Sequence, residues 1–354
     1  MGTPLVVVVF YISGHGFGHA SRDIEIIREL RLRRPDARVI VRTSVPRWLF
    51  APIAGAVVEI QALETDTGLV QLDSRRVDEE ESARQASRFF ARFDHRVATE
   101  AELIRGLRAD VVVGDIPPLA HAAAERAGVP SVALANFTWD WIYGIYPAFE
   151  HIAPDAIPAM RRAYASATLA LRLPLHGGFE PMAAVVRDIP FIARRSTRDP
   201  ADTRRLLGLA DDRPIVLPSF GSYGVDLPME TLRRSSRFTL IECVREPPAG
   251  LLYQDLVAAA DVVVSKPGYG IVSECVANGA ALLYTSRGRF REYDLFVEEM
   301  PRILRCRYLS QDDLFAGDWA DPIDALLAQS APLERPAVNG AEAAAEAIIN
   351  LVIG

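Results

Sequence analysis

The segment SKPGYGIVSE, residues 265 to 274, joins an apolar strand to a helix through a turn that contains glycines. The preceding run Asp261 to Val264 has the valine-rich character of a buried strand, and the residues from Ile271 to Ala277 have a helical pattern. Such a turn leaves backbone N–H groups unpaired at the helix N-terminus, and Gly268 and Gly270 allow a ligand to approach them closely. We therefore predict that this turn binds a diphosphate group.

Strand-like runs alternate with helical stretches along the whole chain, which predicts an α/β protein with doubly wound parallel sheets. In the first half we expect strands at Leu5 to Ile12, Ala37 to Val45, Asp110 to Gly114 and Ser131 to Ala135, and helices at Ser21 to Arg34 and Leu119 to Ala127. In the second half we expect strands at Pro214 to Leu217, Phe238 to Cys243, Asp261 to Val264 and Ala281 to Tyr284, and a further helix at Leu256 to Ala260. Ligands of such sheets bind beyond the carboxyl ends of the strands, so two Rossmann-like domains imply a cleft between them.

The expected domain boundary lies near Arg187. The stretch from Ser166 to Arg195 predicts a linker rather than a core element, because it contains several residues that interrupt regular structure: Pro174, Gly177, Gly178, Pro181 and Pro190. The predicted domains are residues 1–186 and 187–338. An alanine-rich helix at 339–354 follows, and we expect it to pack back across the domains.

Composition excludes several classes of protein. The 354 residues are 50% hydrophobic and carry a net charge of −7, which argues against a nucleic-acid partner. The three cysteines form neither a disulfide framework nor a metal-ligand spacing, so we expect no structural metal and a cytoplasmic protein. The N-terminal apolar run is far shorter than the roughly 20 residues of a membrane-spanning helix, and we predict no transmembrane segment.

A second phosphate-binding element is LPSFGSYG, residues 217 to 224, which ends the first strand of the second half. Its small residues Ser219, Gly221 and Ser222 permit close approach of a backbone to phosphate. An ordinary strand-to-helix turn uses the same residue types without a ligand.

The loop SGHGFGHASR, residues 13 to 22, opens the first predicted helix and contains two histidines. A dinucleotide-binding loop of this kind also needs an acidic residue at the end of the second strand, which here reads VRTSVP. A neutral imidazole in the loop instead suits a general base, and His19 is the candidate, with His15 as the alternative. Asp115 lies at the end of the strand predicted at Asp110 to Gly114. The alternative interpretation is that His19 and Asp115 cap helices.

The segment NFTWDWIYGIY, residues 136 to 146, also follows a strand of the first half. Its aromatic residues Trp139, Trp141 and Tyr143 suit either the lining of a ligand pocket or core packing, and the sequence leaves both open.

Residues 266 to 274 resemble the donor signature of the UDP-dependent glycosyltransferases in length and glycine placement. The resemblance implies that Glu274 binds the ribose hydroxyls and that Lys266, where plant members have histidine, contacts phosphate. It further implies that a donor site includes the turn and first helical residues Gly268, Tyr269, Gly270 and Ile271. An acidic residue in RGRFREYD, residues 287 to 294, is expected to hold the donor sugar, and Glu292 is the candidate; a solvated charged loop is the alternative.

GHGFGHASR, VGDIPP, NFTWDWIY, DIPFIARR and SKPGYGIVSE together resemble the N-terminal, non-kinase portion of plant-type L-arabinokinases. That portion is similar to the peptidoglycan N-acetylglucosaminyltransferase and the UDP-glycosyltransferases. The resemblance implies the GT-B architecture, with an acceptor-side first domain and a second domain that binds the nucleotide sugar, its base near Val244 to Leu252. His19 occupies the position of the glycine-loop histidine of inverting members, and Asp115 that of its aspartate partner.

The resemblance implies a glycosyltransferase that moves a sugar from a nucleotide-sugar donor, expected to be a UDP-sugar, to an acceptor hydroxyl. Retaining members carry a second glutamate seven residues from the first, whereas this chain has Pro267 and Ala281 at those distances from Glu274, so inversion is expected. No bound cofactor or metal is expected. The acceptor is either a small molecule or lipid-linked, and Arg22 to Arg47 with Trp48 is the stretch that peripheral membrane binding would use. The alternatives are a hydrolysing UDP-sugar 2-epimerase and a non-catalytic sugar-nucleotide-binding protein.

Overall fold

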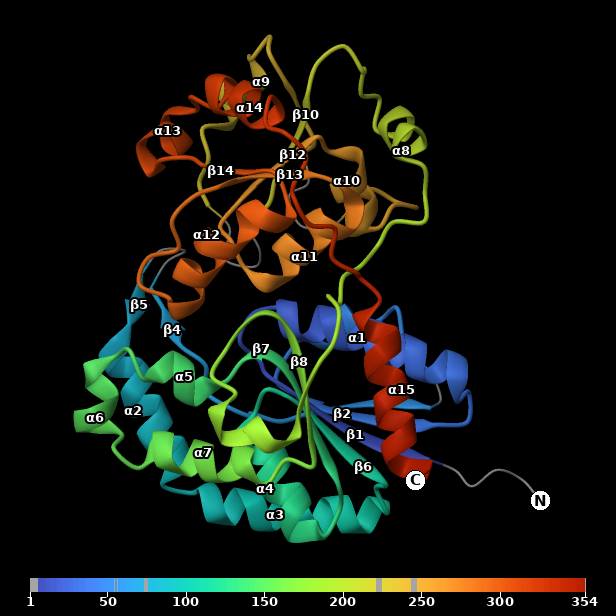
Figure 1. Ribbon diagram of the computed structural model, residues 1–354, viewed down its shortest axis with the longest axis vertical. Coiled ribbons are helices and arrows are strands. Elements are labelled where there is room, and N and C mark those ends of the chain that lie inside the picture. Colours follow the sequence, from blue (N-terminus) through green and yellow to red (C-terminus); the bar gives the residue numbers. More distant parts are fainter. Residues whose placement is uncertain are drawn as a thin grey trace. The chain divides into compact units, whose positions relative to one another are not determined.

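The computed structural model describes residues 6–53, 55, 57–72, 76–220, 225–242 and 247–353, and its contacts divide the chain into two compact units (Figure 1). Unit 1 comprises Met1–Leu72, Val77–Ile192 and Asn339–Gly354. Unit 2 comprises Asp73–Arg76 and Ala193–Val338. Each unit has its own parallel sheet and its own hydrophobic core, as the alternating pattern of the sequence predicts.

The sheet of unit 1 has seven parallel strands in the order β3-β2-β1-β6-β7-β8-β9. Its strands are β1 (Val7–Ile12), β2 (Arg38–Thr43), β3 (Val58–Ala62), β6 (Val111–Asp115), β7 (Ser131–Phe137), β8 (Leu169–Gly177) and β9 (Val186–Asp188). A short antiparallel pair, β4 (Val70–Gln71) and β5 (Val77–Asp78), lies outside this sheet. The four strands predicted in the first half are confirmed.

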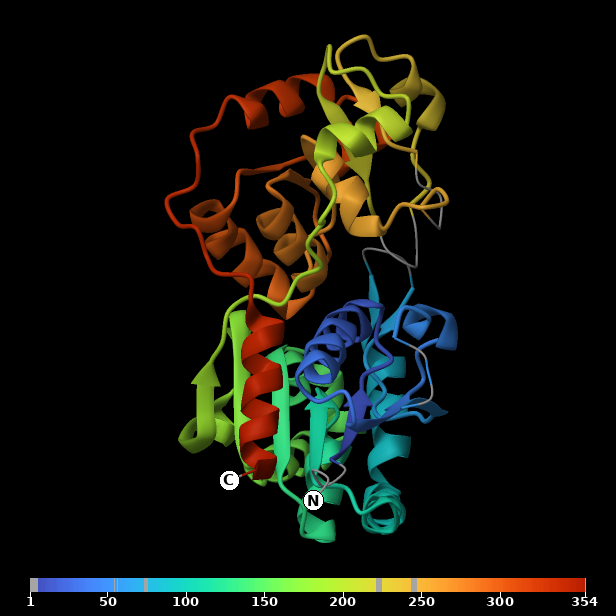
Figure 2. The same cartoon turned by 90° about the vertical axis from the view of Figure 1, so that its right-hand side faces the viewer.

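Helices cover both faces of this sheet, which explains why β1 is apolar at every position rather than at every second one. Val7, Val9 and Tyr11 of β1 pack in the cluster that contains residues of α3 and α4. In both views α1 and α15 lie side by side against the other face (Figures 1 and 2). The helices of unit 1 are α1 (Gly18–Arg33), α2 (Glu79–Phe90), α3 (Phe93–Leu107), α4 (Pro118–Ala127), α5 (Trp139–Tyr143), α6 (Pro147–Ile152), α7 (Ala156–Ala165) and α15 (Gly340–Ile353), with 3-10 turns η1 (Arg47–Phe50) and η2 (Glu180–Val185).

The expectation of a linker from Ser166 to Arg195 was wrong, because β8 and β9 complete the sheet of unit 1 within this stretch. Pro174 lies in β8 at the point where its pairing with β7 becomes irregular, and Leu175 beside it has a positive φ of 57°. A proline is tolerated in a strand at such an irregularity, because no regular ladder hydrogen bond is lost there. Pro174 and Gly177 of this stretch therefore belong to a distorted strand and not to a linker.

Unit 2 contains a five-stranded parallel sheet in the order β11-β10-β12-β13-β14. Its strands are β10 (Ile215–Pro218), β11 (Thr239–Leu240), β12 (Val262–Ser265), β13 (Ala281–Tyr284) and β14 (Cys306–Tyr308). Its helices are α8 (Pro200–Leu206), α9 (Met229–Arg233), α10 (Tyr253–Ala259), α11 (Tyr269–Asn278), α12 (Arg291–Ile303), α13 (Gln311–Ala316) and α14 (Ala320–Leu327). Among the described helices of both units, none has the length and apolarity that a bilayer crossing requires.

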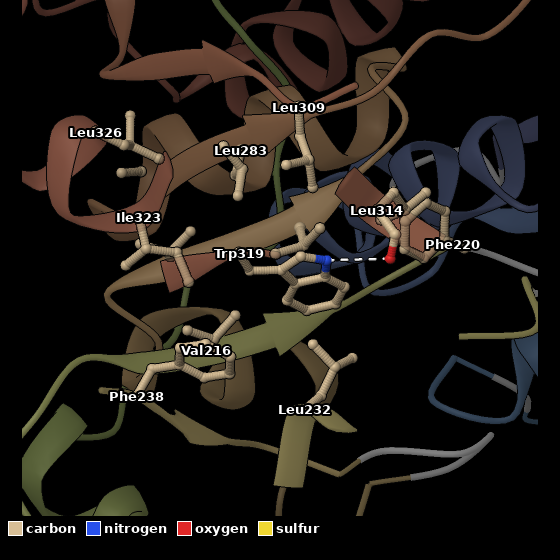
Figure 3. Close-up of a cluster of buried hydrophobic side chains, with 13 residues drawn as sticks. Val216, Phe220, Leu232, Phe238, Leu283, Leu309, Leu314, Trp319, Ile323 and Leu326 are labelled. Carbon is tan, nitrogen blue, oxygen red and sulfur yellow. Dashed lines mark hydrogen bonds between the residues drawn. The ribbon is translucent and has the colours of Figure 1, made fainter. Parts of the chain in front are cut away.

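Trp319 lies in the hydrophobic core of unit 2 (Figure 3). Its indole is fully buried, stacks on Phe238 at a ring distance of 6.3 Å, and donates a hydrogen bond from Nε1 to the carbonyl of Leu314 at 3.2 Å. Val216 of β10 and Leu283 of β13 belong to the same cluster, so this core holds α14 against the sheet.

The chain enters the main part of unit 2 later than the expected boundary near Arg187, and it returns to unit 1 at Asn339. Arg187 lies in β9 and the division falls between Ile192 and Ala193. On its return the chain forms an antiparallel bridge from Asn339 to Ile192, and the amide of Gly340 donates to the carbonyl of Phe191 at 2.9 Å. The C-terminal helix α15 thus belongs to unit 1 and packs against α1.

Gly340 has no space for a side chain, since a Cβ atom there would lie 2.1 Å from the carbonyl oxygen of Pro190. We expect Gly340→Ala to destabilise unit 1 by about 1–3 kcal/mol, because the backbone at the start of α15 must shift to relieve the clash. Urea denaturation followed by circular dichroism measures this. Gly106→Ala in α3 is the control: a Cβ there meets nothing within 4 Å, so it should be neutral or stabilising by up to about 1 kcal/mol. Equal effects of both substitutions would contradict this account of Gly340.

Candidate functional site

The carboxyl ends of β1 and β6 form the topological switch point of unit 1. The chain leaves β1 through α1 toward β2 on one side, whereas β6 pairs with β1 on the other side. Ile12 and Asp115 are register partners at the ends of these strands, and the amide of Ser13 donates to the carbonyl of Asp115 at 2.8 Å. Ligands of parallel sheets bind at this point because the connections on its two sides diverge there.

His19 and Asp115, the two residues predicted for catalysis, are in direct contact at this switch point. His19 Nδ1 lies 2.7 Å from Asp115 Oδ1, and their side chains are 7% and 0% exposed. An ionised carboxylate has no proton to donate, so this contact favours the tautomer with the imidazole proton on Nδ1 and the lone pair on Nε2. That tautomer is the one that a general base requires. His15 has a different environment: its Nδ1 accepts from the amide of Leu69 at 3.4 Å and its ring packs edge-on to Trp139.

Two residues that the sequence analysis did not identify complete this cluster. Arg22 donates from Nε to Asp115 Oδ2 at 2.5 Å and from Nη2 to Asp115 Oδ1, and its Nη1 donates to Asn136 Oδ1 at 2.9 Å. Arg22 follows His19 by three residues and shares its face of α1, a spacing that the sequence shows. Asn136 comes from β7, and only the sheet order brings it to β6.

Two neighbouring carboxyl groups of this cluster, Asp115 and Asp23, have pKa values shifted in opposite directions. Burial by itself would raise the pKa of Asp115, but the Arg22 guanidinium and the His19 ring outweigh it and hold that pKa at about 2. Asp23, the residue after Arg22, is fully buried and neither of its carboxyl oxygens has a hydrogen-bond partner. Burial and the nearby Asp115 carboxylate raise the pKa of Asp23 well above its usual value. The cluster thus favours the ionised form of Asp115 and the protonated form of Asp23.

The aromatic residues of α5 mainly form core contacts. Trp139 and Tyr143 are almost completely buried, and Tyr143 stacks on Phe149 at a ring distance of 4.1 Å. Trp139 also donates from Nε1 to Asp66 Oδ2 at 2.8 Å, which places a loop carboxylate beside this cluster.

In unit 2 the expected diphosphate turn lies at the start of α11. Gly268 is the residue before the helix, and no side chain caps this end. The backbone of Gly268 is extended, with φ −160°, and a Cβ atom there would make only an ordinary contact of 3.7 Å with Arg287. Neither conformation nor protein packing therefore requires glycine at this position, while its small size leaves space in front of the amides of Tyr269, Gly270 and Ile271.

The carboxyl ends of β10 and β12 meet beside this turn. The amide of Ser219, directly after β10, donates to the carbonyl of Val264 at 2.8 Å, and its hydroxyl lies 2.5 Å from that of Tyr253. Lys266 follows β12. Gly221 and Ser222, the other residues predicted for this element, lie outside the described residues, as does part of the segment Val244 to Leu252 that was expected near the base.

Both carboxylates expected in the donor site are buried, and each accepts a hydrogen bond from an arginine. Glu274 is 4% exposed and accepts from Arg194 Nε at 2.6 Å. Glu292, in the first turn of α12, is 3% exposed and accepts from Arg287 Nη1 at 3.2 Å. Arg194 is a residue that the sequence analysis missed, because it comes from the segment that enters unit 2 and no local pattern connects it with α11.

Among the residues that the structure describes, no group of three or more His, Cys, Asp or Glu side chains is placed to hold a metal ion. Within the described part of the chain, arginines pair with the candidate carboxylates: Arg22 with Asp115, Arg194 with Glu274 and Arg287 with Glu292.

The raised pKa of Asp23 predicts a pH-dependent penalty on the stability of unit 1. Because this pKa is higher in the folded protein than in the unfolded chain, the unfolded chain releases the Asp23 proton first as the pH rises from about 4. We expect the wild-type protein to lose stability relative to Asp23→Asn as the pH rises above about 4, and the difference between the two proteins to become independent of pH below about pH 4. Urea denaturation across this range measures the difference, with Asp226→Asn, at an exposed position, as the control. A difference that stays constant with pH would contradict the assignment.

Comparison with known proteins places this geometry in context. No protein-family model matches the chain. An L-arabinokinase from Arabidopsis thaliana is 30% identical over 369 residues, which cover 99% of this chain and 35% of that protein. The chain therefore spans about a third of the length of this curated relative. The resemblance to L-arabinokinases that the motifs indicated is confirmed.

Solved structures show the fold. The calicheamicin glycosyltransferase CalG4 superposes with a TM-score of 0.63 at 14% identity and covers 98% of this chain and 95% of its own. A UDP-glucosyltransferase from Polygonum tinctorium superposes with a TM-score of 0.60 at 16% identity, with all of both chains covered. MurG from Acinetobacter baumannii superposes with a TM-score of 0.53 at 13% identity over 99% of each chain. The chain thus has the GT-B fold of two Rossmann-like domains, and it is similar to plant L-arabinokinase over nearly its whole length.

Proposed function

We propose that the protein is a glycosyltransferase that moves a sugar from a UDP-sugar donor to an acceptor hydroxyl with inversion and without a metal ion. The observation that carries this proposal is the contact of His19 with Asp115 at the switch point of unit 1. A buried aspartate that fixes the Nδ1 proton leaves Nε2 as a base, and the acceptor hydroxyl needs such a base. The GT-B fold supports the same class of reaction by analogy.

Unit 2 would bind the donor. The amides at the start of α11 and the helix dipole suit the diphosphate, and Lys266 adds a positive charge after the neighbouring strand. Glu274 uses Oε1 to bind Arg194, and its further acceptor capacity suits ribose hydroxyls. Among the similar structures, the Polygonum tinctorium enzyme is a UDP-glucosyltransferase, and Phytolacca americana UGT2 is complexed with UDP-2-fluoroglucose.

The reaction is a single displacement. His19 Nε2 removes the proton of the acceptor hydroxyl, whose oxygen attacks the anomeric carbon of the donor. The bond from that carbon to the diphosphate oxygen breaks, and UDP leaves with the electron pair. Asp115 orients the ring and stabilises the imidazolium, while the α11 amides and Lys266 stabilise the charge that develops on the diphosphate. These fixed donors are the reason why we propose that no metal ion is needed.

Donor binding is tested by calorimetric titration with UDP, GDP, dTDP and ADP, with and without chelator. We expect selective binding of UDP that chelator does not change and that Glu274→Gln weakens about tenfold to 100-fold, because a charge-assisted hydrogen bond to ribose is lost. Glu298→Gln on α12, at an exposed position, is the matched control and should bind normally. Absence of binding to all four nucleotides would reject the glycosyltransferase proposal and leave only the fold.

Transfer is tested by UDP release from a panel of UDP-hexoses and UDP-pentoses with sugars and polyols as acceptors. We expect His19→Ala to reduce the rate about 100-fold to 10,000-fold with donor binding unchanged, since only the base is lost. His95→Ala, an exposed histidine on α3, is the control.

Two results of the same assay would contradict the proposal. If UDP is released at the same rate without acceptor and with an epimerised sugar as the product, the protein is a hydrolysing epimerase. If His19→Ala leaves both binding and a negligible wild-type rate unchanged, the protein binds sugar nucleotides without catalysing transfer.

A further inference from the structure

The loop that follows β3 contributes a carboxylate to the His19 site. Asp66 lies in this loop, and Thr65 beside it donates from Oγ1 to the carbonyl of Ile12 at 3.0 Å. β2 separates β3 from β1 in the sheet, so the loop reaches past the end of β2 to arrive at the end of β1. No motif in the sequence marks Asp66, because its position depends on this crossing.

Asp66 is held by two uncharged donors. Its Oδ1 accepts from the hydroxyl of Ser13 at 3.1 Å, and its Oδ2 accepts from Trp139 Nε1 at 2.8 Å. Both oxygens therefore act as acceptors, which suits the ionised form of the group. The amide of Ser13 in turn donates to the carbonyl of Asp115, so Asp66 is connected to the catalytic pair through one residue.

Several contacts hold the loop around Asp66 in place. Gly68 has a φ of +57°, and a Cβ atom there would lie 2.7 Å from His15 Nδ1, so the backbone is packed directly on the ring. Tyr143 donates from its hydroxyl to the carbonyl of Gly68 at 2.7 Å and lies 3.1 Å from Thr67 Oγ1. A side chain on such a loop is positioned before a ligand arrives, which reduces the entropy that binding costs.

Asp66 differs from Asp115 in both exposure and charge compensation. Asp115 is fully buried and neutralised by Arg22, whereas Asp66 is only partly buried and, among the described residues, forms no ion pair with arginine or lysine. Burial raises the pKa of Asp66 to about 6, although Trp139, Ser13 and the His19 ring act in the opposite direction. A partly exposed carboxylate with unneutralised charge has acceptor capacity left for a ligand.

We propose that Asp66 binds a second hydroxyl of the acceptor, next to the one that His19 deprotonates, and that the acceptor is therefore a polyhydroxylated molecule such as a sugar or cyclitol. This proposal rests on the proposed function and names its acceptor class. Two vicinal hydroxyls require two neighbouring hydrogen-bond acceptors, and His19 Nε2 and the Asp66 carboxylate are the two groups of this cluster that suit them. An apolar lipid alcohol has no second hydroxyl to donate to Asp66 and would leave its charge with only the two uncharged donors Ser13 and Trp139.

The proposal is tested by ligand-detected NMR with L-arabinose, D-galactose and myo-inositol, and with trans-1,2-cyclohexanediol against cyclohexanol. We expect the wild-type protein to bind the polyols and the diol, and Asp66→Asn, which keeps the shape of the side chain, to weaken them at least tenfold. Cyclohexanol binding should be the same in both proteins, because it has no second hydroxyl. Thermal melting of Asp66→Asn confirms that the variant is folded.

The pH dependence of the same binding separates Asp66 from its titratable neighbours, which are His19 on α1, Asp115 on β6, His15 in the first loop, and Tyr143 and Tyr164. We expect polyol binding to weaken on acidification through about pH 6 in the wild-type protein and in His19→Ala, but not in Asp66→Asn. Trp139→Phe removes a donor that favours the carboxylate, so it should move this midpoint upward.

Equal polyol binding by the wild-type protein and Asp66→Asn would overturn the proposal, and so would absence of polyol binding to the wild-type protein. Titration of the same samples with UDP keeps this result separate from the proposed function. UDP binding without polyol binding rejects only the role of Asp66. Polyol binding that depends on Asp66, without binding of any nucleotide, rejects the glycosyltransferase proposal and keeps Asp66 as a polyol-binding residue.

Discussion

The ion pair between Arg22 and Asp115 is the interaction on which the site in unit 1 depends. Both side chains are buried, and the guanidinium contacts both oxygens of the carboxylate. Removal of one partner from such a pair leaves an uncompensated buried charge, which typically costs about 3–5 kcal/mol. The pair joins α1 to the end of β6, and through Asn136 it also includes β7. His19 can only contact Asp115 in a fixed geometry because Arg22 already holds the carboxylate in place.

Arg22 also approaches the histidine itself. Its Nη2 lies 3.0 Å from His19 Nδ1, so the guanidinium contacts both members of the His19–Asp115 pair. The surrounding carboxyl groups then matter. Asp66 has no arginine or lysine partner among the described residues and carries negative charge once ionised, while burial and the Asp115 carboxylate raise the pKa of Asp23. The cluster thus distributes its charge over several groups rather than relying on a single His–Asp pair.

Unit 2 uses the same physical principle with different groups. Backbone amides lie at the start of α11, directly after Gly268. Neither the backbone conformation nor the packing of the protein requires glycine at that position. Each buried carboxylate near this helix end is paired with an arginine, Glu274 with Arg194 and Glu292 with Arg287. A buried carboxylate without such a partner would be an uncompensated charge away from water. Each arginine therefore compensates the charge of the carboxylate that it contacts.

The sequence by itself determined the fold class and the elements closest to the motifs. Continuous apolar runs such as β1 and β12 show their burial on both faces, and the glycine turn before α11 and the histidine loop before α1 are local features. It predicted the His19–Asp115 contact only through resemblance, and it misassigned β8, because a proline at an irregular point of a strand looks like a linker residue. The tertiary structure alone brought in Asn136, Asp66 and Arg194, and showed that α15 returns to unit 1. Each of these residues reaches its partner across strands or crossovers far apart in the chain, and strand order leaves no periodic signal in a sequence.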